Sequence, residues 1–278
     1  MLLYISDLDG TLLNSEQLLS EYTIRTVNRL IDNGLHFTIA TARSYESAGP
    51  LIEPLRLNVP LIFNNGVYLY DPIRRENLVA NLLERDMALP LLDPCETAGV
   101  RPIVFATNER GEKKIYYTGI RHHGEAVYIN ERLAKGDRRL TLVDDFQDCR
   151  MAEIISMVWI NERDVLAPFY EQVKANTELM CHFTQDIYSK AYWLEITSRC
   201  ANKRWAVEYL KQYLRASEII CFGDNLNDLP MFEIADQKCA VANGHPQLKQ
   251  AATHIIGNHN QDGVARFLAG RCEEKELA

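Results

Sequence analysis

The sequence predicts an α/β protein that has a doubly wound parallel-sheet core and an inserted α+β cap. Short apolar runs alternate with helix-like segments in residues 1–90 and again after residue 200. This alternation favours right-handed crossovers and a parallel sheet. Between these parts the candidate strands are longer and often alternate apolar with polar residues. We therefore expect a core made of residues 1–80 and 191–278, and an inserted cap made of residues 81–190.

The first elements alternate strand and helix. The apolar run 2–6 is too short for a helix and is bounded by Asp-Gly turn chemistry, which predicts a buried strand. Ser20 is a typical N-cap, apolar residues then recur at helical spacing, and Gly34 suits the helix end. Further along, the pattern predicts strands at 36–40 and 60–63 with a helix at 44–56 between them.

The middle of the chain is expected to form a sheet of its own. Its predicted strands are 101–107, 113–118, 153–160 and 179–186, with a helix at 163–176 and a hairpin connection at 108–111. The core pattern then returns with helices at 203–213, 229–235 and 264–268 and strands at 218–222, 238–241 and 254–256.

Composition excludes several classes of protein. Thirty Lys and Arg against 38 Asp and Glu give a net charge of −8, which argues against duplex binding because that needs cations to displace counterions. No apolar run approaches the ~18 residues of a membrane span, and the start of the chain lacks a signal-peptide pattern. Seven scattered cysteines without a C-x-x-C pair favour reduced thiols. We expect a cytoplasmic protein without nucleic-acid or membrane partners, and its oligomeric state stays open.

Four polar clusters each follow directly on a predicted core strand. In open parallel sheets the ligand crevice lies beyond the carboxyl ends of the strands, so these clusters are expected to converge there. The clusters are Asp7–Thr11, Thr41–Arg43, Asn64–Gly66 and Gly223–Asp228.

Asp7 and Asp9 lie on chain that leaves the first strand, and Gly10 lets the backbone turn sharply. Asp7 could attack a phosphorus atom and form a covalent acyl phosphate. Asp9 could protonate the leaving oxygen and then activate water. Taken alone, the tripeptide is more typical of a solvated Asp-Gly turn.

The acidic cluster near Asp224 favours the catalytic alternative. A carboxylate that approaches a phosphate dianion meets repulsion of roughly 4 kcal/mol per charge pair at about 4 Å, so a cation is needed. Asp224 would supply a second oxygen ligand opposite Asp7, which suits Mg²⁺, and Asp228 could orient a metal-bound water or a lysine. A calcium-binding loop is excluded, because three of its required positions hold apolar residues. Leu226 stands at the third position, where a ligand is needed, Leu229 at the glycine position, and Ala235 at the position of the final glutamate. A plain turn stays open.

Thr41 and Lys203 are candidate partners for phosphoryl oxygens. Thr41 offers a hydroxyl and a backbone donor at the end of the second strand. Lys203 is the first residue of a predicted helix, and a helix N-terminus that carries an ammonium group is a favourable binding site for phosphoryl oxygens. Taken alone, each is more typical of a surface position.

In this order, the motifs resemble those of the haloacid dehalogenase superfamily and, within it, the Cof-type hydrolases. The motifs are Asp-Leu-Asp-Gly-Thr-Leu, Ala-Thr-Ala-Arg, Asn-Gly, Lys203 and Gly-Asp-Asn-Leu-Asn-Asp, and the resemblance covers essentially the whole chain. It implies a Rossmann-like core with a cap between the second and third motifs. It also implies a Mg²⁺-dependent phosphatase that works through an aspartyl-phosphate, with Asp7 as nucleophile, Asp9 as acid/base, and Thr41 and Lys203 on the phosphoryl oxygens.

The resemblance further implies where the metal and the phosphate bind. Magnesium is expected on Asp7, the backbone carbonyl of Asp9 and Asp224, with Asp228 in support. The loop residues expected at the phosphate or its rim are Ala42, Arg43, Asn65, Gly66 and Asn227.

Two positions depart from the family pattern. Ala42 and Arg204 stand where the family generally has glycine. Neither change removes a catalytic group, so we expect activity to survive. An aspartate at position 9 favours phosphate-ester cleavage, since carbon–halogen cleavage needs no acid for its leaving group.

We therefore expect a phosphomonoesterase that acts on sugar phosphates or phosphorylated cofactors. A phosphomutase using the same aspartate pair, a hydrolase of pyrophosphates or acyl phosphates, and a non-catalytic phosphate-ligand sensor stay open. In the cap, the basic group 121–123 is typical of a solvated turn. Trp159, His182 and Trp193 lie in predicted strands, where aromatic residues are typical of a core.

Overall fold

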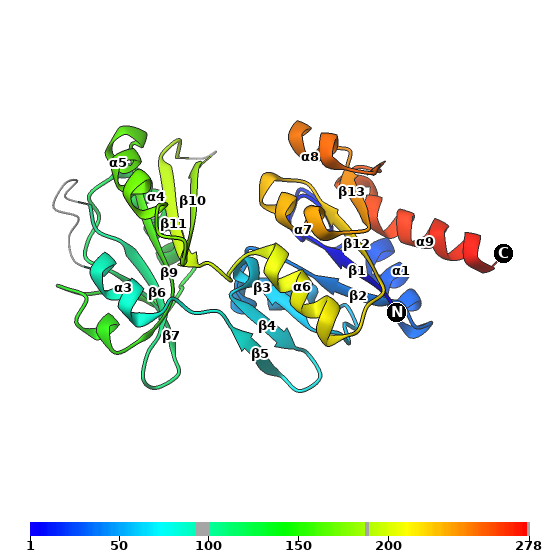
Figure 1. Cartoon of the computed structure of the whole chain (residues 1–278), viewed down its shortest axis with the longest axis horizontal. Coiled ribbons are helices and arrows are strands. Elements are labelled where there is room, and N and C mark those ends of the chain that lie inside the picture. Colours follow the sequence, from blue (N-terminus) through cyan, green and yellow to red (C-terminus); the bar gives the residue numbers. More distant parts are fainter. Residues whose placement is uncertain (93–99, 187–188, 277–278) are drawn as a thin grey trace. The chain divides into compact units, whose positions relative to one another are not determined.

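The computed structural model describes residues 1–92, 100–186 and 189–276. Two compact units make up the chain (Figure 1). The core unit is Met1–Ala80 with Ala201–Ala278, and the cap unit is Asn81–Cys200. The cap extends past the boundary expected at residue 190, because the strand Tyr192–Ser198 pairs with two strands of the cap sheet.

A parallel sheet of five strands forms the centre of the core, in the order β14-β13-β12-β1-β2. Its strands are β1 (Leu2–Ser6), β2 (His36–Ile39), β12 (Glu218–Gly223), β13 (Gln237–Val241) and β14 (His254–Ile256). Segments from the two ends of the chain thus lie side by side, with β1 between β12 and β2 (Figure 1). The expected α/β class with a parallel core is confirmed.

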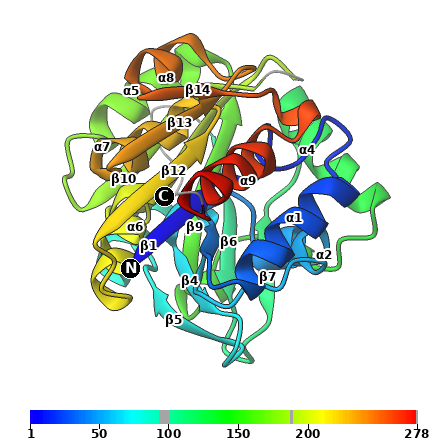
Figure 2. The same cartoon turned by 90° about the vertical axis from the view of Figure 1, so that its right-hand side faces the viewer.

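Helices cover both faces of this sheet, because the strand residues alternate between them. Leu3, Ile5 and Cys221 pack with α6 and α7, while Phe222 points the other way and contacts Phe267 of α9. On that second face α1 and α9 run side by side (Figure 2). The core helices are α1 (Glu21–Asp32), α2 (Tyr45–Ile52), α6 (Lys203–Tyr213), α7 (Leu229–Ile234), α8 (Pro246–Ala251) and α9 (Gly263–Glu276).

A small antiparallel sheet of β3 (Leu61–Phe63), β4 (Tyr68–Asp71) and β5 (Glu76–Ala80) extends the core. A parallel bridge between Ala40 and Ile62 joins it to β2. The sequence pattern predicts β3 but neither β4 nor β5. The 3₁₀ turn η1 (Asn64–Gly66) separates β3 from β4 and carries the third motif.

The cap has a sheet in the order β10-β11-β9-β6-β7-β8. Ile129 of α4 packs with Val158 and Ile160 of β9, whereas Leu166 of α5 packs with Trp159 on the other face. The elements are α3 (Arg85–Leu92), β6 (Ile103–Thr107), β7 (Lys113–Tyr117), α4 (His123–Ala134), β8 (Leu140–Leu142), β9 (Glu153–Asn161), α5 (Arg163–Val173), β10 (Leu179–Gln185) and β11 (Tyr192–Ser198).

Two expectations from composition can be compared with the described part of the chain. None of its helices is long and apolar enough to cross a membrane. Its cysteines with described side chains are free thiols: Cys149, Cys181, Cys200, Cys221 and Cys239. Cys95 and the side chain of Cys272 lie outside the described residues.

Candidate active site

The end of the core sheet brings together charged residues from three separate segments. Asp7 follows β1, Asp224 follows β12, and Asp228 ends the 3₁₀ turn η3 (Leu226–Asp228). Lys203 opens α6 and is only 1% exposed. Its Nζ donates hydrogen bonds to Asp7 Oδ1 at 2.5 Å and to Asp228 Oδ1 at 2.7 Å. A lysine taken alone is expected at the surface, and for Lys203 that expectation is wrong.

Local structure around the start of α6 fixes Lys203. The N-cap residue Asn202 accepts a hydrogen bond from Trp205 N at 2.9 Å, so Lys203 takes the first helical position. The η1 loop lies directly against this point. A Cβ on Gly66, which has φ +108°, would lie 2.6 Å from the backbone oxygen of Asn202. Gly66 therefore belongs to the site through close backbone packing.

The Asp228 carboxylate holds its neighbours in position. Its Oδ1 holds Lys203, and its Oδ2 accepts hydrogen bonds from the backbone N–H groups of Asp224 at 2.9 Å and Asn225 at 3.0 Å. The turn after β12 is thereby fixed, with the Asp224 carboxylate facing Gly10. A Cβ on Gly10 would lie 2.6 Å from Asp224 Oδ2, so glycine is required there.

Burial controls the ionisation of this cluster. Desolvation raises the pKa of Asp7 to about 8, against the opposing attraction of Lys203 and with help from the charge of Asp228. Desolvation and the Asp228 charge likewise raise the pKa of Asp224 to about 6. Burial opposes the charge of Lys203, yet Asp228 and Asp7 together raise the pKa of Lys203 above its ordinary value.

The donor set of the cluster fits a hard divalent cation. Asp7, Asp224 and Asp228 each offer a carboxylate oxygen, and these atoms lie within 4.8 Å of one another. Three ionised carboxylates against the ammonium of Lys203 leave two negative charges uncompensated in a mostly buried site, which is costly without a cation. Oxygen ligands are those that Mg²⁺ prefers.

Asp9 points to a different partner. Arg43 donates from Nε to Asp9 Oδ2 at 2.7 Å and from Nη2 to Asp9 Oδ1 at 2.5 Å. Nη2 also donates to Gln17 Oε1 at 2.9 Å. The side chain of Asp9 is 45% exposed, so it stays accessible from solvent. Arg43 was expected at the phosphate, but its guanidinium forms two hydrogen bonds to Asp9, the expected acid/base.

The second and third motifs meet through their backbones. Asn65 N donates to Thr41 O at 2.9 Å, and Asn65 has φ +53°. The backbone N–H of Thr41 already donates to Ile62 O at 3.0 Å, so the expected backbone donor is not available and only the hydroxyl remains. The amide oxygen of Asn65 is buried without a hydrogen-bond partner.

The remaining expected positions are peripheral. Ala42 is exposed and Asn227 is half-buried in η3. Arg204 lies on the surface of α6, where it pairs with Glu208 at 3.1 Å and Glu233 at 2.6 Å. Its side chain is therefore engaged away from the acidic cluster.

The site holds two polar residues for which the sequence suggested no role: Thr11, at the end of the Asp7–Thr11 cluster, and Asn243, which lies in none of the expected clusters. Thr11 Oγ1 donates to Asp224 Oδ1 at 3.2 Å, and Asn243 Nδ2 donates to the backbone oxygen of Gly10 at 2.7 Å. Asn243 comes soon after β13. The same end-of-strand reasoning that found Asp224 could have found it.

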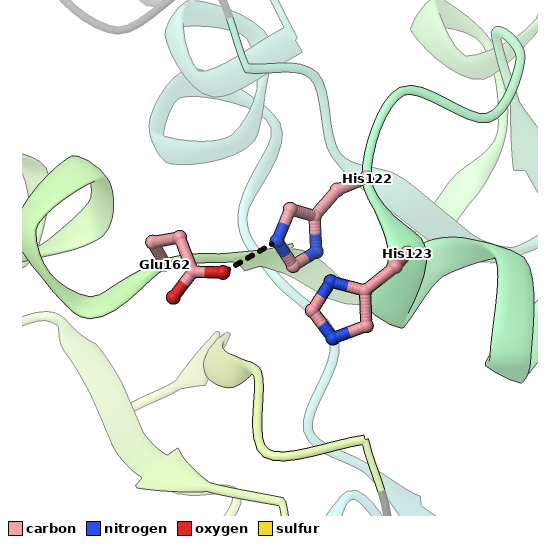
Figure 3. Close-up of side chains that lie close together, drawn as sticks. All are labelled: His122, His123 and Glu162. Atoms are coloured by element: carbon pink, nitrogen blue, oxygen red, sulfur yellow. Dashed lines mark hydrogen bonds and ion pairs between the residues drawn. The ribbon is translucent and has the colours of Figure 1, made fainter.

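A second cluster of potential metal ligands lies in the cap. His122 Nε2 lies 3.1 Å from Glu162 Oε1, with His123 beside it (Figure 3). His122 Nδ1 accepts a hydrogen bond from Gly124 N at 3.1 Å, which favours the tautomer with its proton on Nε2. That proton is donated to Glu162. Because His122 and Glu162 are also the N-caps of α4 and α5, the positive helix ends disfavour a cation here.

Comparison with known proteins gives one consistent result. The sequence profile of the haloacid dehalogenase-like hydrolase family matches residues 4–268. A 5-amino-6-(5-phospho-D-ribitylamino)uracil phosphatase of Bacillus subtilis is 28% identical, with 94% of each chain covered. A pyridoxal phosphate phosphatase of Escherichia coli is 24% identical over 95% of each chain. A haloacid dehalogenase-like hydrolase from Bacteroides thetaiotaomicron has the same fold, with TM-score 0.76, 21% identity and coverage of 96% of this chain and 98% of that one.

Proposed function

The chain belongs to the haloacid dehalogenase-like hydrolase family, and from this premise we propose that it is a Mg²⁺-dependent phosphatase of small phosphorylated metabolites. One observation carries the proposal. A buried carboxylate, Asp7, is held by a buried ammonium next to two further carboxylates. Such a group can act as a nucleophile toward phosphorus once a cation offsets the repulsion between its charge and that of the phosphate.

Asp7, Asp224 and the backbone carbonyl of Asp9 would hold the magnesium ion, and Asp228 would keep Asp224 and Lys203 in place. Bound there, Mg²⁺ would supply charge compensation between the carboxylates and the phosphoryl oxygens.

In the first half-reaction, an oxygen of Asp7 attacks phosphorus while the bond from phosphorus to the alcohol oxygen breaks. Asp9 gives its proton to that leaving oxygen, so the alcohol departs neutral. Lys203, an ammonium held by Asp7 and Asp228, neutralises charge on the phosphoryl oxygens, and the hydroxyl of Thr41 donates to one of them.

In the second half-reaction, Asp9 takes a proton from water. The water oxygen attacks the phosphorus of the acyl phosphate, and the bond between phosphorus and Asp7 breaks, which releases phosphate and restores both carboxyl groups. Arg43 acts as a positioning residue, because its two hydrogen bonds fix the direction of the Asp9 carboxylate.

The relatives support small phosphorylated metabolites as substrates. The two named phosphatases act on a phosphorylated ribitylaminouracil and on pyridoxal phosphate. Each covers nearly the whole chain, cap included. Sugar phosphates and phosphorylated cofactors are therefore the substrates to test first.

Phosphate release from sugar phosphates, nucleotides, pyridoxal phosphate and an aryl phosphate tests the proposal. The assay runs with Mg²⁺ and with a chelator, on the parent chain and on Asp7→Asn. We expect Mg²⁺-dependent release that falls by more than ~10³-fold in the variant. Equal release from the variant would show that Asp7 is not the nucleophile. Transfer from a labelled bisphosphate without release would indicate a mutase, and binding without any turnover a sensor.

A further inference from the structure

The Asp9 carboxylate depends on Arg43 for its direction. Within the part of the chain that the structure describes, both hydrogen bonds that this carboxylate accepts come from the Arg43 guanidinium. The side chain of Asp9 is 45% exposed and that of Arg43 is 21% exposed. Because packing alone does not fix side chains with this much exposure, whatever holds Arg43 also sets the direction of Asp9.

Gln17 holds the end of Arg43 that bonds to Asp9. Nη2 of Arg43, which donates to Asp9 Oδ1, also donates to Gln17 Oε1 at 2.9 Å. A further hydrogen bond, from Arg43 Nη1 to Ser47 Oγ, is longer at 3.3 Å. Nη2 carries two protons, so it can serve both oxygens, and the Gln17 amide is neutral, so it does not compete with Asp9 for the charge of Arg43. Gln17 therefore restrains the guanidinium and leaves its ion pair with Asp9 intact.

The backbone around Gln17 forms a tight loop. Gln17 has φ +60°, in the left-handed region that residues with a Cβ seldom adopt. Asn14 closes the loop, because its Oδ1 accepts hydrogen bonds from Glu16 N and Leu18 N, each at 3.0 Å. Its backbone oxygen accepts another from Gln17 N at 2.9 Å. Such a conformation persists only where the surrounding structure holds it, and here it places Gln17 within reach of Arg43.

The last part of the core anchors this loop. The 3₁₀ turn η4 (His259–Gln261) lies between β14 and α9. Ser15 N donates to Asn260 Oδ1 at 2.8 Å, and Asn260 Nδ2 donates back to Ser15 Oγ at 2.9 Å. One side chain thus satisfies two groups of a residue that is 245 positions away in the sequence. A continuous set of contacts therefore runs from η4 through the loop to the Arg43 guanidinium.

We propose that Gln17 is a positioning residue for Asp9, on which it acts through Arg43. The contact of Asn260 with the loop keeps Gln17 in place. This inference rests on the proposed phosphatase function, in which Asp9 protonates the leaving oxygen. Without the Gln17 amide the guanidinium turns more freely, and Asp9 points at the leaving oxygen for a smaller fraction of the time. Proton transfer to that oxygen becomes slower, while the attacking carboxylate is untouched.

Leaving-group dependence tests this role. Gln17→Met removes the amide and keeps the length of the side chain. The ratio kcat/KM reports the steps up to departure of the leaving group, and 4-nitrophenolate departs without a proton. For the alkyl phosphate that the parent chain hydrolyses fastest, kcat/KM should fall roughly three- to tenfold. For 4-nitrophenyl phosphate it should change by less than about twofold. Equal falls on both substrates would overturn the inference, because they would indicate a general loss of the site.

Gln247→Met is the matched control. It makes the same change at an exposed position of α8, where the Gln247 amide has no hydrogen-bond partner among the described residues. This variant should change kcat/KM by less than about twofold on both substrates. Gln17 is likewise exposed, so neither variant should change the melting temperature.

A double-mutant cycle tests whether Gln17 acts through Arg43. Arg43→Met removes the guanidinium and with it the contact that Gln17 makes. In that background, Gln17→Met should change kcat/KM for the alkyl phosphate by less than about twofold, since effects within one network are not additive. A second full fall in that background would show that Gln17 acts independently of Arg43 and would overturn the inference.

Proton exchange at Arg43 decides the inference without turnover. The Nε proton of Arg43 is donated to Asp9 Oδ2 at 2.7 Å, so its exchange with solvent reports how often this contact opens. In a ¹⁵N spectrum, its signal is identified by its loss in Arg43→Met. Gln17→Met should speed this exchange at least about threefold, and Gln247→Met should leave it unchanged. Unchanged exchange in Gln17→Met would overturn the inference. Absence of phosphate release from the parent chain would refute the proposed function, while the exchange rates would still decide whether Gln17 holds Arg43 against Asp9.

Asn260→Ala tests the anchor of the loop by the same measurement. Asn28→Ala is its control, because Asn28 also uses both of its amide groups on another segment, with Pro54 O at 2.9 Å and Arg56 N at 2.7 Å. Proton exchange at Arg43 should be faster in Asn260→Ala and unchanged in Asn28→Ala. Equal exchange rates in the two variants would overturn the role of Asn260.

Discussion

Replacing Lys203 by methionine removes the only ammonium that contacts Asp7 and Asp228 in the described structure and keeps the helix-forming stem. Each ion pair, at 2.5 and 2.7 Å, corresponds to roughly 6 kcal/mol by Coulomb's law at an effective dielectric constant of about 20. Desolvation of the ammonium offsets several kcal/mol of this attraction. Breaking a buried pair by removing one partner leaves a net loss of about 3–5 kcal/mol.

Chemical denaturation of the metal-free protein measures this loss, and Lys211→Met is the control. Lys211 lies on the same helix with its side chain 38% exposed, 3.8 Å from Asp236, so its removal should change stability by less than about 0.5 kcal/mol. The loss in Lys203→Met should also depend on pH. Without the ammonium, the pKa of Asp7 in the folded state lies even further above its value in the unfolded chain. The folded variant then keeps a proton that the folded parent chain loses near pH 8, so its deficit is nearly constant below about pH 7 and grows as the pH rises above about 8.

If Lys203→Met costs no more than Lys211→Met at the higher pH, the carboxylates do not depend on Lys203 and the electrostatic account of the site is wrong. A deficit that shrinks as pH rises would contradict the sign of the argument. Either result would leave the positions of Asp7 and Asp228 without a physical explanation.

Further predictions concern the metal, the η1 loop and Arg43. Because Mg²⁺ needs ionised ligands, and the metal-free pKa values are raised to about 6 at Asp224 and about 8 at Asp7, calorimetric Mg²⁺ affinity should rise from about pH 5.5 to about pH 8. Gly66→Ala should lose more than about 2 kcal/mol in denaturation, since its Cβ would lie 2.6 Å from a backbone oxygen at φ +108°. Arg43→Lys loses the two hydrogen bonds that orient Asp9, the proton donor to the leaving oxygen. Its kcat should therefore fall more for an alkyl phosphate than for 4-nitrophenyl phosphate, whose leaving group needs no proton.

Controls make these outcomes decisive. Gly34→Ala tests positive φ alone, because Gly34 has φ +91° with nothing within 4 Å of an added Cβ, and it should lose only about 1 kcal/mol. Equal losses at both glycines would rule out the close packing of the η1 loop. An Mg²⁺ affinity that is flat with pH, or equal falls in kcat for both leaving groups, would contradict the other two predictions.

The sequence predicted the core well because its signals are local. A short apolar run followed by Asp, Thr or Asn marks a strand end wherever the sheet lies, and this located Asp7, Thr41 and Asp224 before any contact was known. The contact between Lys203 and two of the carboxylates depends on tertiary packing. Lysine by itself indicates a surface residue, so only the motif order suggested a role for it.

The less successful expectations have the same cause. The strand Tyr192–Ser198 has a buried-strand pattern, but which sheet it joins is set by pairing with β9 and β10, and the chain gives no local sign of that choice. Arg43 carries a charge suited to phosphate, and its actual partner, Asp9, becomes its neighbour only when β1 and β2 pair. Local pattern thus predicts elements, while partners follow from topology.

The order of strands in the core sheet has a consequence for biosynthesis. Lys203 is synthesised 196 residues after Asp7, and β12, which pairs with β1, comes later still. A nascent chain can form the cap sheet, residues 103–198, before β12 has been synthesised and can pair with β1 in the core sheet. The acidic centre is therefore assembled late in synthesis, and a transcript cut short anywhere before the codon for Asp228 yields no complete site.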